Sequence, residues 1–494
     1  MNTVFPFHKK CAVAGLLALA CMFTPSCRRD LLELAPEDRF SESTVFDTPD
    51  RIEKLRNGLY DAVKNGNFLG ALYIVFSDAR AEEFLDESGN LFFVLGVWNH
   101  TENESFSQIN RVWNAGYFAI NSCNIFIKGV QANRQVLGND QLALQYEAEA
   151  RFLRALSYYS LMTLYARPYT DGNGNQLGLV LRLGAEPGAS PKDLARASGQ
   201  EMYDQILSDL DFAVQNLPLD YGDDFQNTTY AHRNTAIALK TRVLLTMGRY
   251  AELIAEADRI VPPAAPFVAL SGVLHALQDD VRSVFEAPYL TPENIFSLPF
   301  TGNDPALGQT SIQYFYNPAP AGNGDASLNP GGILGDSVWA TGDVRRQAFV
   351  FYNPVNGKPY LSKFPNGNPG TDFIPVIRYA EVLLNLSEAL ARTTGITQRA
   401  VDLLNAVRGR SNSAGVYALS DFTNADALIQ AILKERRIEL LGEGFRPNDC
   451  LRLLLPIPAK ANVPAIQPGD GRYIWPIPSS EISVNTLCEQ NPGY

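Results

Sequence analysis

The segment EAEARFLRALSYYSLMTLYAR, at residues 147–167, decides the fold. Phe152, Leu156 and Tyr159 recur in it at helical spacing, and Pro168, which disfavours continuation of a helix, follows it. The pattern predicts a long amphipathic helix. Similar apolar patterns occur at residues 201–217, 234–247, 249–260, 377–392, 398–410 and 426–441. Short breaks such as Gly248 and Gly395 join most of these segments, so we expect antiparallel helix pairs.

The segment LLTMGRYAELIAEADRIVPP, at residues 244–263, loosely resembles one tetratricopeptide unit. Its second helix is too short for a strict repeat, so we expect tetratricopeptide-like pairs. Such pairs bury a shared core by stacking and form a scaffold. The predicted fold class is mainly α, with these pairs supporting an irregular, loop-rich half with minor β structure.

The composition changes in the middle of the chain to Pro, Gly, Asn and aromatic residues, as in YFYNPAPAGNGDASLNPGG at residues 314–332. Long loops of this kind are often functional. We therefore expect residues 27–494 to form a single domain in three parts. These are a helical N-terminal part at 27–260, a loop-rich insertion at 261–375, and a C-terminal helical part with a closing tail at 376–494.

The N-terminus has the layout of a secretory signal. Lys9 and Lys10 precede an apolar run at residues 11–23, which is too short to span a bilayer as a permanent helix. Ser26 stands before Cys27, as at the cleavage site of a bacterial lipoprotein, so residues 1–26 are predicted to be a lipoprotein signal peptide and Cys27 the lipidation site. Cleavage before Cys21, or a plain signal without lipid, is the alternative. A lipid would tether the chain without a spanning segment.

Composition and motif content argue against several classes of function. The net charge of −12 comes without a basic stripe, which argues against nucleic acid as a partner. Cys123, Cys450 and Cys488 are spaced neither as a zinc cluster nor as a disulfide framework; at most one bridge is possible, and free thiols are an equal alternative. The 4 histidines form no metal-ligand motif, and no phosphate loop or nucleophile motif occurs. We therefore expect no metal, no cofactor and no catalysis.

Four blocks of the chain, in order, resemble the SusD/RagB family. They are RRDLLELAPEDRFSESTVFDTPDRIEKLRNGLYDAV at residues 28–63, the helical segment at 147–168, VIRYAEVLLNLSEALARTTGITQRAVDLLNAVRGR at 376–410, and ILKERRIELLGEGFRPNDCLRL at 432–453 with the ending YIWPIPSSEISVNTLCEQNPGY at 473–494. Pro447 and Asn448 depart from the family, whose members often have Trp or Tyr there. Residues 262–375 cannot be aligned by eye, so the family's ligand residues do not transfer to that region.

The resemblance implies a lipoprotein of the outer membrane that faces the exterior. Members of the family are partners of SusC-like TonB-dependent importers, and the resemblance implies that this chain binds a nutrient glycan and delivers it to such an importer without breaking bonds. A peptide- or glycopeptide-binding lipoprotein of the same importer type is the first alternative. A surface glycoside hydrolase, which would need two carboxylates facing each other across a cleft, and a structural cell-surface scaffold are the others.

A glycan site needs aromatic faces for sugar rings, flanked by polar groups for the hydroxyls. Two stretches outside the obvious helices have this mixture, at residues 72–104 and 313–339. The predicted ligand-binding residues are Tyr73, Asp78, Arg80, Trp98, Asn99, Tyr314, Tyr316 and Trp339. Asp78 and Arg80 are alternatively a surface ion pair.

Other conspicuous side chains are interpreted as structural. Trp113 and Trp475 are expected in the core. The charged residues of the helical blocks, Glu149, Arg154, Arg437 and Glu439, invite an interpretation as catalytic acid and clamp, but a buried carboxylate beside arginine is more often a structural ion pair.

Overall fold

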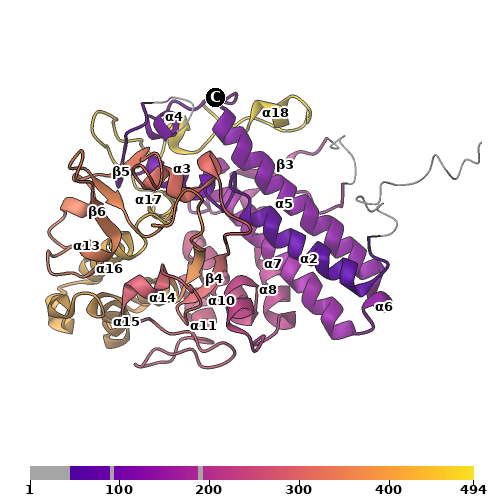
Figure 1. The fold of residues 1–494 in the computed structure, drawn as a ribbon, viewed down its shortest axis with the longest axis horizontal. Coiled ribbons are helices and arrows are strands. Elements are labelled where there is room, and N and C mark those ends of the chain that lie inside the picture. Colours follow the sequence, from indigo (N-terminus) through magenta and orange to yellow (C-terminus); the bar gives the residue numbers. More distant parts are fainter. Residues whose placement is uncertain (1–44, 90–93, 187–192) are drawn as a thin grey trace, which may run out of the picture.

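The structure, a computed structural model, describes residues 45–89, 94–186 and 193–494. The predicted signal peptide and Cys27 lie outside the described residues. Figure 1 shows a mainly helical protein, with several long helices on the right, and with short strands among further helices and loops on the left. The predicted fold class is therefore confirmed.

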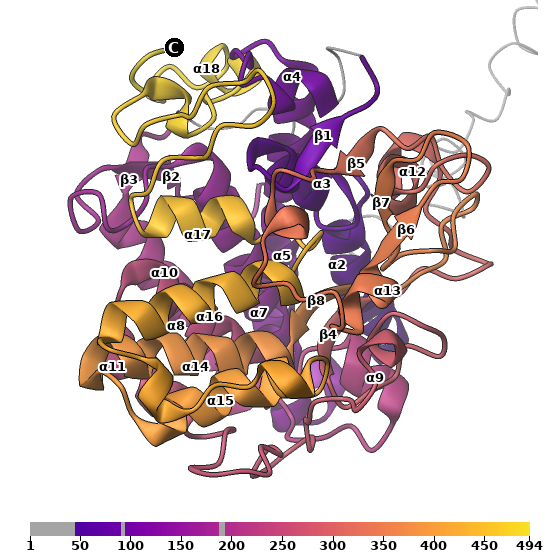
Figure 2. The same ribbon diagram turned by 90° about the vertical axis from the view of Figure 1, so that its left-hand side faces the viewer.

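One series of helices packs side by side. They are α2 (Pro49–Lys64), α5 (Ser107–Ala132), α7 (Asp140–Tyr165), α8 (Gly199–Asn216), α10 (Arg233–Met247), α11 (Tyr250–Ala257), α14 (Tyr379–Thr394), α15 (Gln398–Gly409) and α16 (Ala425–Glu439). Helix α7 packs between α5 and α8, and α10 connects α8 to α11 and α14. Figure 2 shows α14, α15 and α16 lying together at the far end of this series. Gly248 and Gly395 join consecutive helices that pack together, as predicted.

Helix α7 differs from the prediction in its start and its burial. It begins at Asp140, seven residues before the predicted start, because the Asn139 side chain accepts hydrogen bonds from the backbone N–H groups of Gln141 and Leu142. From residue 152 to its end every side chain is buried, since helices α5 and α8 cover two of its sides. The expected amphipathic helix is thus a central core helix.

Among the described residues, the strands form four antiparallel pairs. They are β1 (Phe84–Asp86) with β5 (Ala326–Leu328), β2 (Leu177–Val180) with β3 (Arg196–Ser198), β4 (Asn294–Leu298) with β8 (Ile374–Arg378), and β6 (Val350–Tyr352) with β7 (Pro359–Leu361). The helix predicted at 377–392 begins only at Tyr379, because residues 374–378 belong to the buried strand β8. A short apolar run does not distinguish a buried strand from a helix start.

Short helices complete the fold. They are α3 (Leu72–Arg80), α4 (Val94–Trp98), α6 (Arg134–Leu137), α9 (Asp224–Thr229), α12 (Ile312–Tyr316), α13 (Arg345–Phe349), α17 (Arg446–Arg452) and α18 (Ser479–Ile482). Cys123, Cys450 and Cys488 are buried free thiols. In the part of the chain that the structure describes, no helix combines the length and the apolar character needed to cross a bilayer.

The C-terminal tail closes onto the end of α7. The backbone N–H of Trp475 donates to the carbonyl oxygen of Leu164 (2.8 Å), and the Asn491 amide donates to the carbonyl oxygens of Tyr165 and Trp475 (both 2.7 Å). Trp475 is fully buried, and Trp113 is 1% exposed. The prediction that both tryptophans lie in the core is confirmed.

Ion pairs connect neighbouring helices. Glu149 on α7 accepts hydrogen bonds from Arg56 (2.6 Å) and Tyr60 (2.7 Å) on α2, and Arg154 donates to Asp209 on α8 (2.7 and 2.8 Å). All of these groups are buried. The structural interpretation of Glu149 and Arg154 is confirmed, because each forms an ion pair with a side chain of a neighbouring helix.

Candidate functional site

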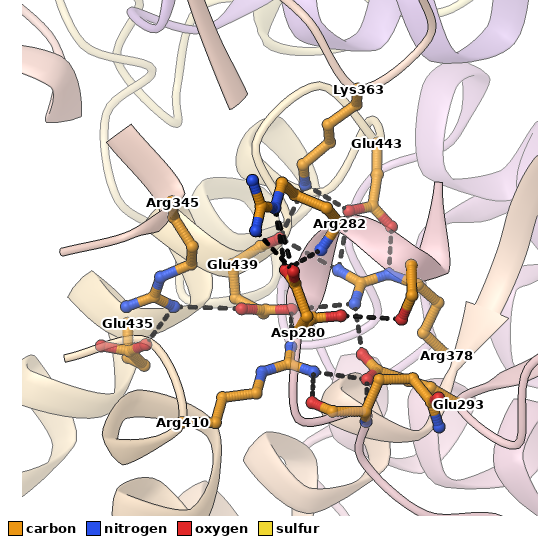
Figure 3. Close-up of polar contacts among 12 residues, drawn as sticks. Asp280, Arg282, Glu293, Arg345, Lys363, Arg378, Arg410, Glu435, Glu439 and Glu443 are labelled. Carbon is orange, nitrogen blue, oxygen red and sulfur yellow. Dashed lines mark hydrogen bonds and ion pairs between the residues drawn. The ribbon is translucent and has the colours of Figure 1, made fainter. Parts of the chain in front are cut away.

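A buried charged network lies where α16 meets β8 and α13. Figure 3 shows Glu439 among Arg345, Arg378 and Arg410. The network consists of Arg345, Lys363, Arg378, Arg408, Arg410, Glu293, Asp343, Glu435, Glu439 and Glu443. Glu439 is at its centre: it contacts Arg345 (3.0 Å), Arg378 (2.8 Å) and Arg410. Five cationic and five anionic side chains balance one another within this charged network.

The lowered pKa of Glu439 argues against acid–base catalysis by this side chain. Burial would raise the pKa of Glu439, but the charges of Arg410, Arg378 and Arg345 outweigh burial and hold this pKa well below its usual range. A carboxylate in this state does not donate a proton near neutral pH. Arg437 likewise pairs with Glu82 (3.0 Å) and Glu83 (2.6 Å). The structural interpretation of Glu439 and Arg437 is confirmed.

Two buried histidines form a second titratable cluster. The rings of His232 and His275 stack with centroids 5.1 Å apart. Nδ1 of His275 lies 2.9 Å from the carbonyl oxygen of Pro292, which fits a neutral ring that donates from Nδ1. Burial lowers the pKa of His275 to about 4, and it also lowers the pKa of His232 well below its ordinary value. Both rings are therefore neutral in the folded protein at neutral pH.

This pair predicts a loss of stability in mild acid. Because the folded pKa of His275 lies below its unfolded value of about 6.5, its contribution is fully present above pH 6.5 and is lost as the pH falls toward 4. We expect the free energy of unfolding to fall by up to about 1.4 kcal/mol per pH unit for each such histidine in this window. Urea unfolding between pH 7 and pH 4.5 measures this slope. His275→Gln should flatten it, and Leu274→Ala, at an exposed neighbouring position, should not; equal slopes in wild type and His275→Gln would contradict the assignment.

Asp78, Arg80 and Tyr316, three of the predicted ligand-binding residues, lie in the core. Asp78 accepts hydrogen bonds from the Tyr316 hydroxyl (2.8 Å) and the backbone N–H of Gly444 (3.2 Å). Burial raises the pKa of Asp78 to about 8. Arg80 donates to the carbonyl oxygen of Tyr473 (2.8 Å). The alternative that Asp78 and Arg80 form a surface ion pair is wrong, because both are buried and bind different partners.

The two predicted tryptophans are also buried. Trp98 is 6% exposed and donates from Nε1 to the carbonyl oxygen of Phe84 (2.9 Å), with the Lys460 ammonium 5.4 Å from its ring. Trp339 is 1% exposed, and the Arg346 guanidinium lies 4.9 Å from its ring. These contacts give both rings a structural role, and ligand contact by them stays a prediction.

The remaining three predicted residues are half-buried. Tyr73 lines a small cavity of about 30 Å³, and its hydroxyl oxygen lies 3.0 Å from that of Thr163. Asn99 follows directly after α4. Tyr314, on α12, faces an open hollow. The structure therefore does not bring the eight predicted residues together on one surface.

The hollow beside α12 has a volume of about 200 Å³ and is called here the α12 hollow. It is lined by Gly308, Ser311, Tyr314, Pro320, Ala321, Gly322, Asn323, Asn368 and Gly370. Helix α12 and its preceding turn form one wall, and the loops at residues 317–325 and 366–371 form the others. Figure 2 shows α12 at the loop-rich edge of the molecule, remote from α11 and α15. The α12 hollow is thus a feature of the predicted loop-rich insertion.

Asp372 holds one loop of the α12 hollow against α12. Its carboxylate accepts hydrogen bonds from Gln313 (3.0 Å), Tyr289 (3.0 Å) and the backbone and side chain of Asn366 (2.9 and 2.7 Å). The loops also approach one another closely: a Cβ atom on Gly367 would lie 2.0 Å from the carbonyl oxygen of Ala321. The walls are therefore set by contacts behind the surface.

The α12 hollow presents an aromatic ring together with hydrogen-bonding groups. The backbone N–H of Asn323 donates to the carbonyl oxygen of Tyr314 (2.8 Å), which ties the second loop to α12. The Tyr314 hydroxyl and the Asn368 amide make no hydrogen bond with other described residues, and the Asn323 and Asn368 side chains are exposed. Such groups can hydrogen-bond sugar hydroxyls while the ring contacts the apolar face of the sugar.

Two other hollows have a different chemistry. A groove of about 310 Å³ between α2 and α5 is mainly apolar, with Leu55, Phe118 and Phe126 among its lining residues. A hollow of about 290 Å³ near α9 contains Asp220 and Asp224 and lacks an exposed aromatic face among its described lining. Among the described residues, no cluster of three or more His, Cys, Asp or Glu side chains could hold a metal ion. Of these three hollows, the α12 hollow is the one whose lining combines an aromatic ring with exposed amide groups.

The sequence analysis did not single out Ser311, Asn323, Asn368 or Asp372. Asn323 lies in the quoted Asn- and Gly-rich stretch, and Asn368 lies in the similar run NGNPG at residues 366–370. These Asn- and Gly-rich runs could have indicated loops that contact a ligand. The placement of the 366–371 loop against α12 could not be predicted, since it depends on the contacts of Asp372.

Family models match two parts of the chain. A model described as "Starch-binding associating with outer membrane" matches residues 30–245, and a model described as "SusD family" matches residues 292–457. Both matched regions include helices of the packed series.

Similarity to individual proteins extends over nearly the whole chain. A solved SusD superfamily protein from Bacteroides fragilis is 30% identical, with a TM-score of 0.80 over 90% of this chain and 100% of that one. SusD-like protein P2 of Formosa agariphila is 26% identical over 94% of this chain and 96% of its own length. A solved laminarin binding SusD-like protein is 22% identical, with a TM-score of 0.71 over 91% of this chain and 100% of that one. The similarity to the laminarin binding protein, at 22% identity, shows a shared fold.

Proposed function

The chain belongs to the SusD/RagB family, and from this premise we propose that it captures a nutrient glycan at the α12 hollow and delivers it to a SusC-like TonB-dependent importer. The protein is anchored through a lipid on Cys27 to the outer membrane and faces the exterior. The family description as starch-binding and the laminarin binding relative support a glycan as cargo. The proposal rests on the position of Tyr314, whose hydroxyl makes no hydrogen bond within the described part of the chain and which lies in a lining of small and amide-bearing residues.

The lining of the α12 hollow favours a glycan over a peptide. Peptide capture would use groups that pair with charged termini or unpaired strand edges. Gly370, which lines the α12 hollow, exchanges two backbone hydrogen bonds with Ala306 (both 2.9 Å), so these backbone groups are occupied. The described lining contains no charged side chain.

The same lining favours binding without cleavage. A glycoside hydrolase needs two carboxyl groups on opposite sides of the scissile bond. Neither Asp nor Glu is among the described residues that line the α12 hollow. The proposed mechanism is retention of the sugar by ring contact and hydrogen bonds, followed by release to the importer.

Tyr314→Ala tests the proposal. Removal of a ring that covers a sugar face should cost roughly 1.5–3 kcal/mol, which corresponds to a loss of affinity of about tenfold or more. Affinity electrophoresis against a polysaccharide panel that includes laminarin and starch, followed by calorimetry, measures the change. Tyr314→Phe, which keeps the ring, should bind within a few-fold of wild type.

Tyr352→Ala provides the matched control, because Tyr352 on β6 is 60% exposed and does not line the α12 hollow. It should leave the affinity unchanged. Equal affinity of Tyr314→Ala and wild type would overturn the assignment of the site. Release of free sugar from a bound polymer would overturn binding without cleavage.

A further inference from the structure

We infer that the α12 hollow is selective for uncharged glycans and discriminates against glycans that carry carboxylate or sulfate groups. This inference rests on the proposed function and adds the chemical class of the cargo. It follows from the charges of the residues that line the α12 hollow and of those that surround it.

The first step is the absence of a cation from the lining. Recognition of a uronate or sulfate group generally uses Arg or Lys, whose charge-assisted hydrogen bonds replace the water lost by the anion. The described lining offers hydroxyl, amide and backbone groups, with no Arg or Lys. An anionic sugar in the α12 hollow would therefore lose hydration without gaining a counter-charge.

The second step is the acidic surround. Asp372 lies behind the 366–371 loop, and Asp325 is bonded to Asn323 of the lining. These carboxylates would repel a bound anion where they are ionised. The whole chain carries a net charge of −12, which adds a weaker repulsion at a distance.

The third step is that the lysine side chains near the α12 hollow are already paired with carboxylates. Lys64, whose Nζ contacts the loop that leads into the α12 hollow, pairs there with Asp304 and also lies 3.5 Å from Asp61. Lys358, on the β6–β7 turn, pairs with Glu87. Each has a carboxylate partner, so neither is a ready partner for a ligand anion.

The fourth step is the size and rim of the α12 hollow. At about 200 Å³ it is smaller than the roughly 300–1,000 Å³ of pockets that enclose a whole small ligand. Leu307, beside Gly308, is 64% exposed and extends the apolar character of the rim. The geometry suits a short stretch of a polymer that contacts the protein through ring faces and hydroxyl groups.

The experiment compares one polymer in two charge states. Laminarin and starch are each tested beside a sample of the same polymer oxidised at C6 to the carboxylate, with calorimetry at 50 and 500 mM NaCl. For the polymer that binds, we expect at least a tenfold weaker affinity of the oxidised form at low salt. The affinity of the neutral form should be nearly independent of salt, because no ion pair forms.

A charge-adding variant makes the test specific to the α12 hollow. Asn368→Lys should raise affinity for the oxidised polymer at least fivefold at 50 mM NaCl, with the gain reduced at 500 mM. Asn368→Gln also places a longer side chain at a backbone position with φ +56°, but it adds no charge. It should therefore show no gain in affinity for the oxidised polymer.

The outcomes separate the two proposals. If the oxidised polymer binds as tightly as its neutral parent, or if Asn368→Lys gives no gain, charge selectivity at the α12 hollow is overturned while glycan capture stands. If alginate, pectate and carrageenan bind and every neutral polymer fails, the selectivity is likewise overturned. If no polymer binds, the proposed function itself is overturned.

Discussion

Glu439→Gln is expected to lower the free energy of unfolding by about 3–5 kcal/mol. The substitution keeps the shape of the side chain and removes one negative charge from the centre of the charged network. Arg345, Arg378 and Arg410 would then share an uncompensated positive charge in a site where none of them is more than 6% exposed. Loss of one partner of a buried ion pair is costly because the remaining charge has already lost its water.

Urea or guanidinium unfolding of purified protein measures this effect. Asp280→Asn is the matched control, because Asp280 and Arg282 form a pair near the network whose side chains are 49% and 58% exposed. This exposed pair should change stability by less than about 1 kcal/mol. Since the folded pKa of Glu439 is depressed, its contribution is present above its unfolded pKa of about 4.3 and is lost below it. A cost for Glu439→Gln no larger than that of the control would contradict the structural role.

Trp475→Ala is expected to cost about 3–5 kcal/mol, the range for a large buried aromatic side chain. The ring packs edge-on against Phe76 and Tyr165, with centroids 6.5 and 5.4 Å apart, and its Nε1 donates to Glu102 (2.9 Å). The substitution leaves a cavity and removes a hydrogen bond from a buried carboxylate. Both effects loosen the tail where it closes onto α7.

Thermal and chemical unfolding measure this second effect, and Val484→Ala, at a 51% exposed position of the same tail, is the control. The control should lie within about 0.5 kcal/mol of wild type. Because Trp475 does not line the α12 hollow, glycan affinity of the folded Trp475→Ala protein should be unchanged. A small loss of stability, or a loss of affinity in protein that remains folded, would contradict this account.

Helices α7, α8, α10, α11, α14, α15 and α16 were predicted because their signals are local, whereas α2 and α5 were not predicted as helices. Helix α8 is an example: the Ser198 side chain accepts from the backbone N–H of Glu201, and the Glu201 carboxylate accepts from the backbone N–H of Ser198. This capping box and the apolar spacing after it are visible in the sequence. Strand β8 could not be distinguished from a helix start, because its pairing with β4 joins residues about eighty positions apart in the chain.

The site could be predicted only in part. The residues around Trp98 are typical of a loop, which predicts an exposed ring. Its ring is buried through contacts with Phe84 and with Lys460, which is far away in the sequence. Tyr314 was predicted from its neighbours, and it does line a hollow. The other wall comes from residues 366–371, which Asp372 holds in place. Contacts of this long-range kind leave no periodic trace in the sequence.

The loops at residues 317–325 and 366–371 contribute none of the ten side chains of the charged network. Their sequences can therefore diverge while the electrostatic interior that supports the helices stays the same. Selection for a different ligand can thus change a small outer portion of the molecule without loss of stability in the helical frame.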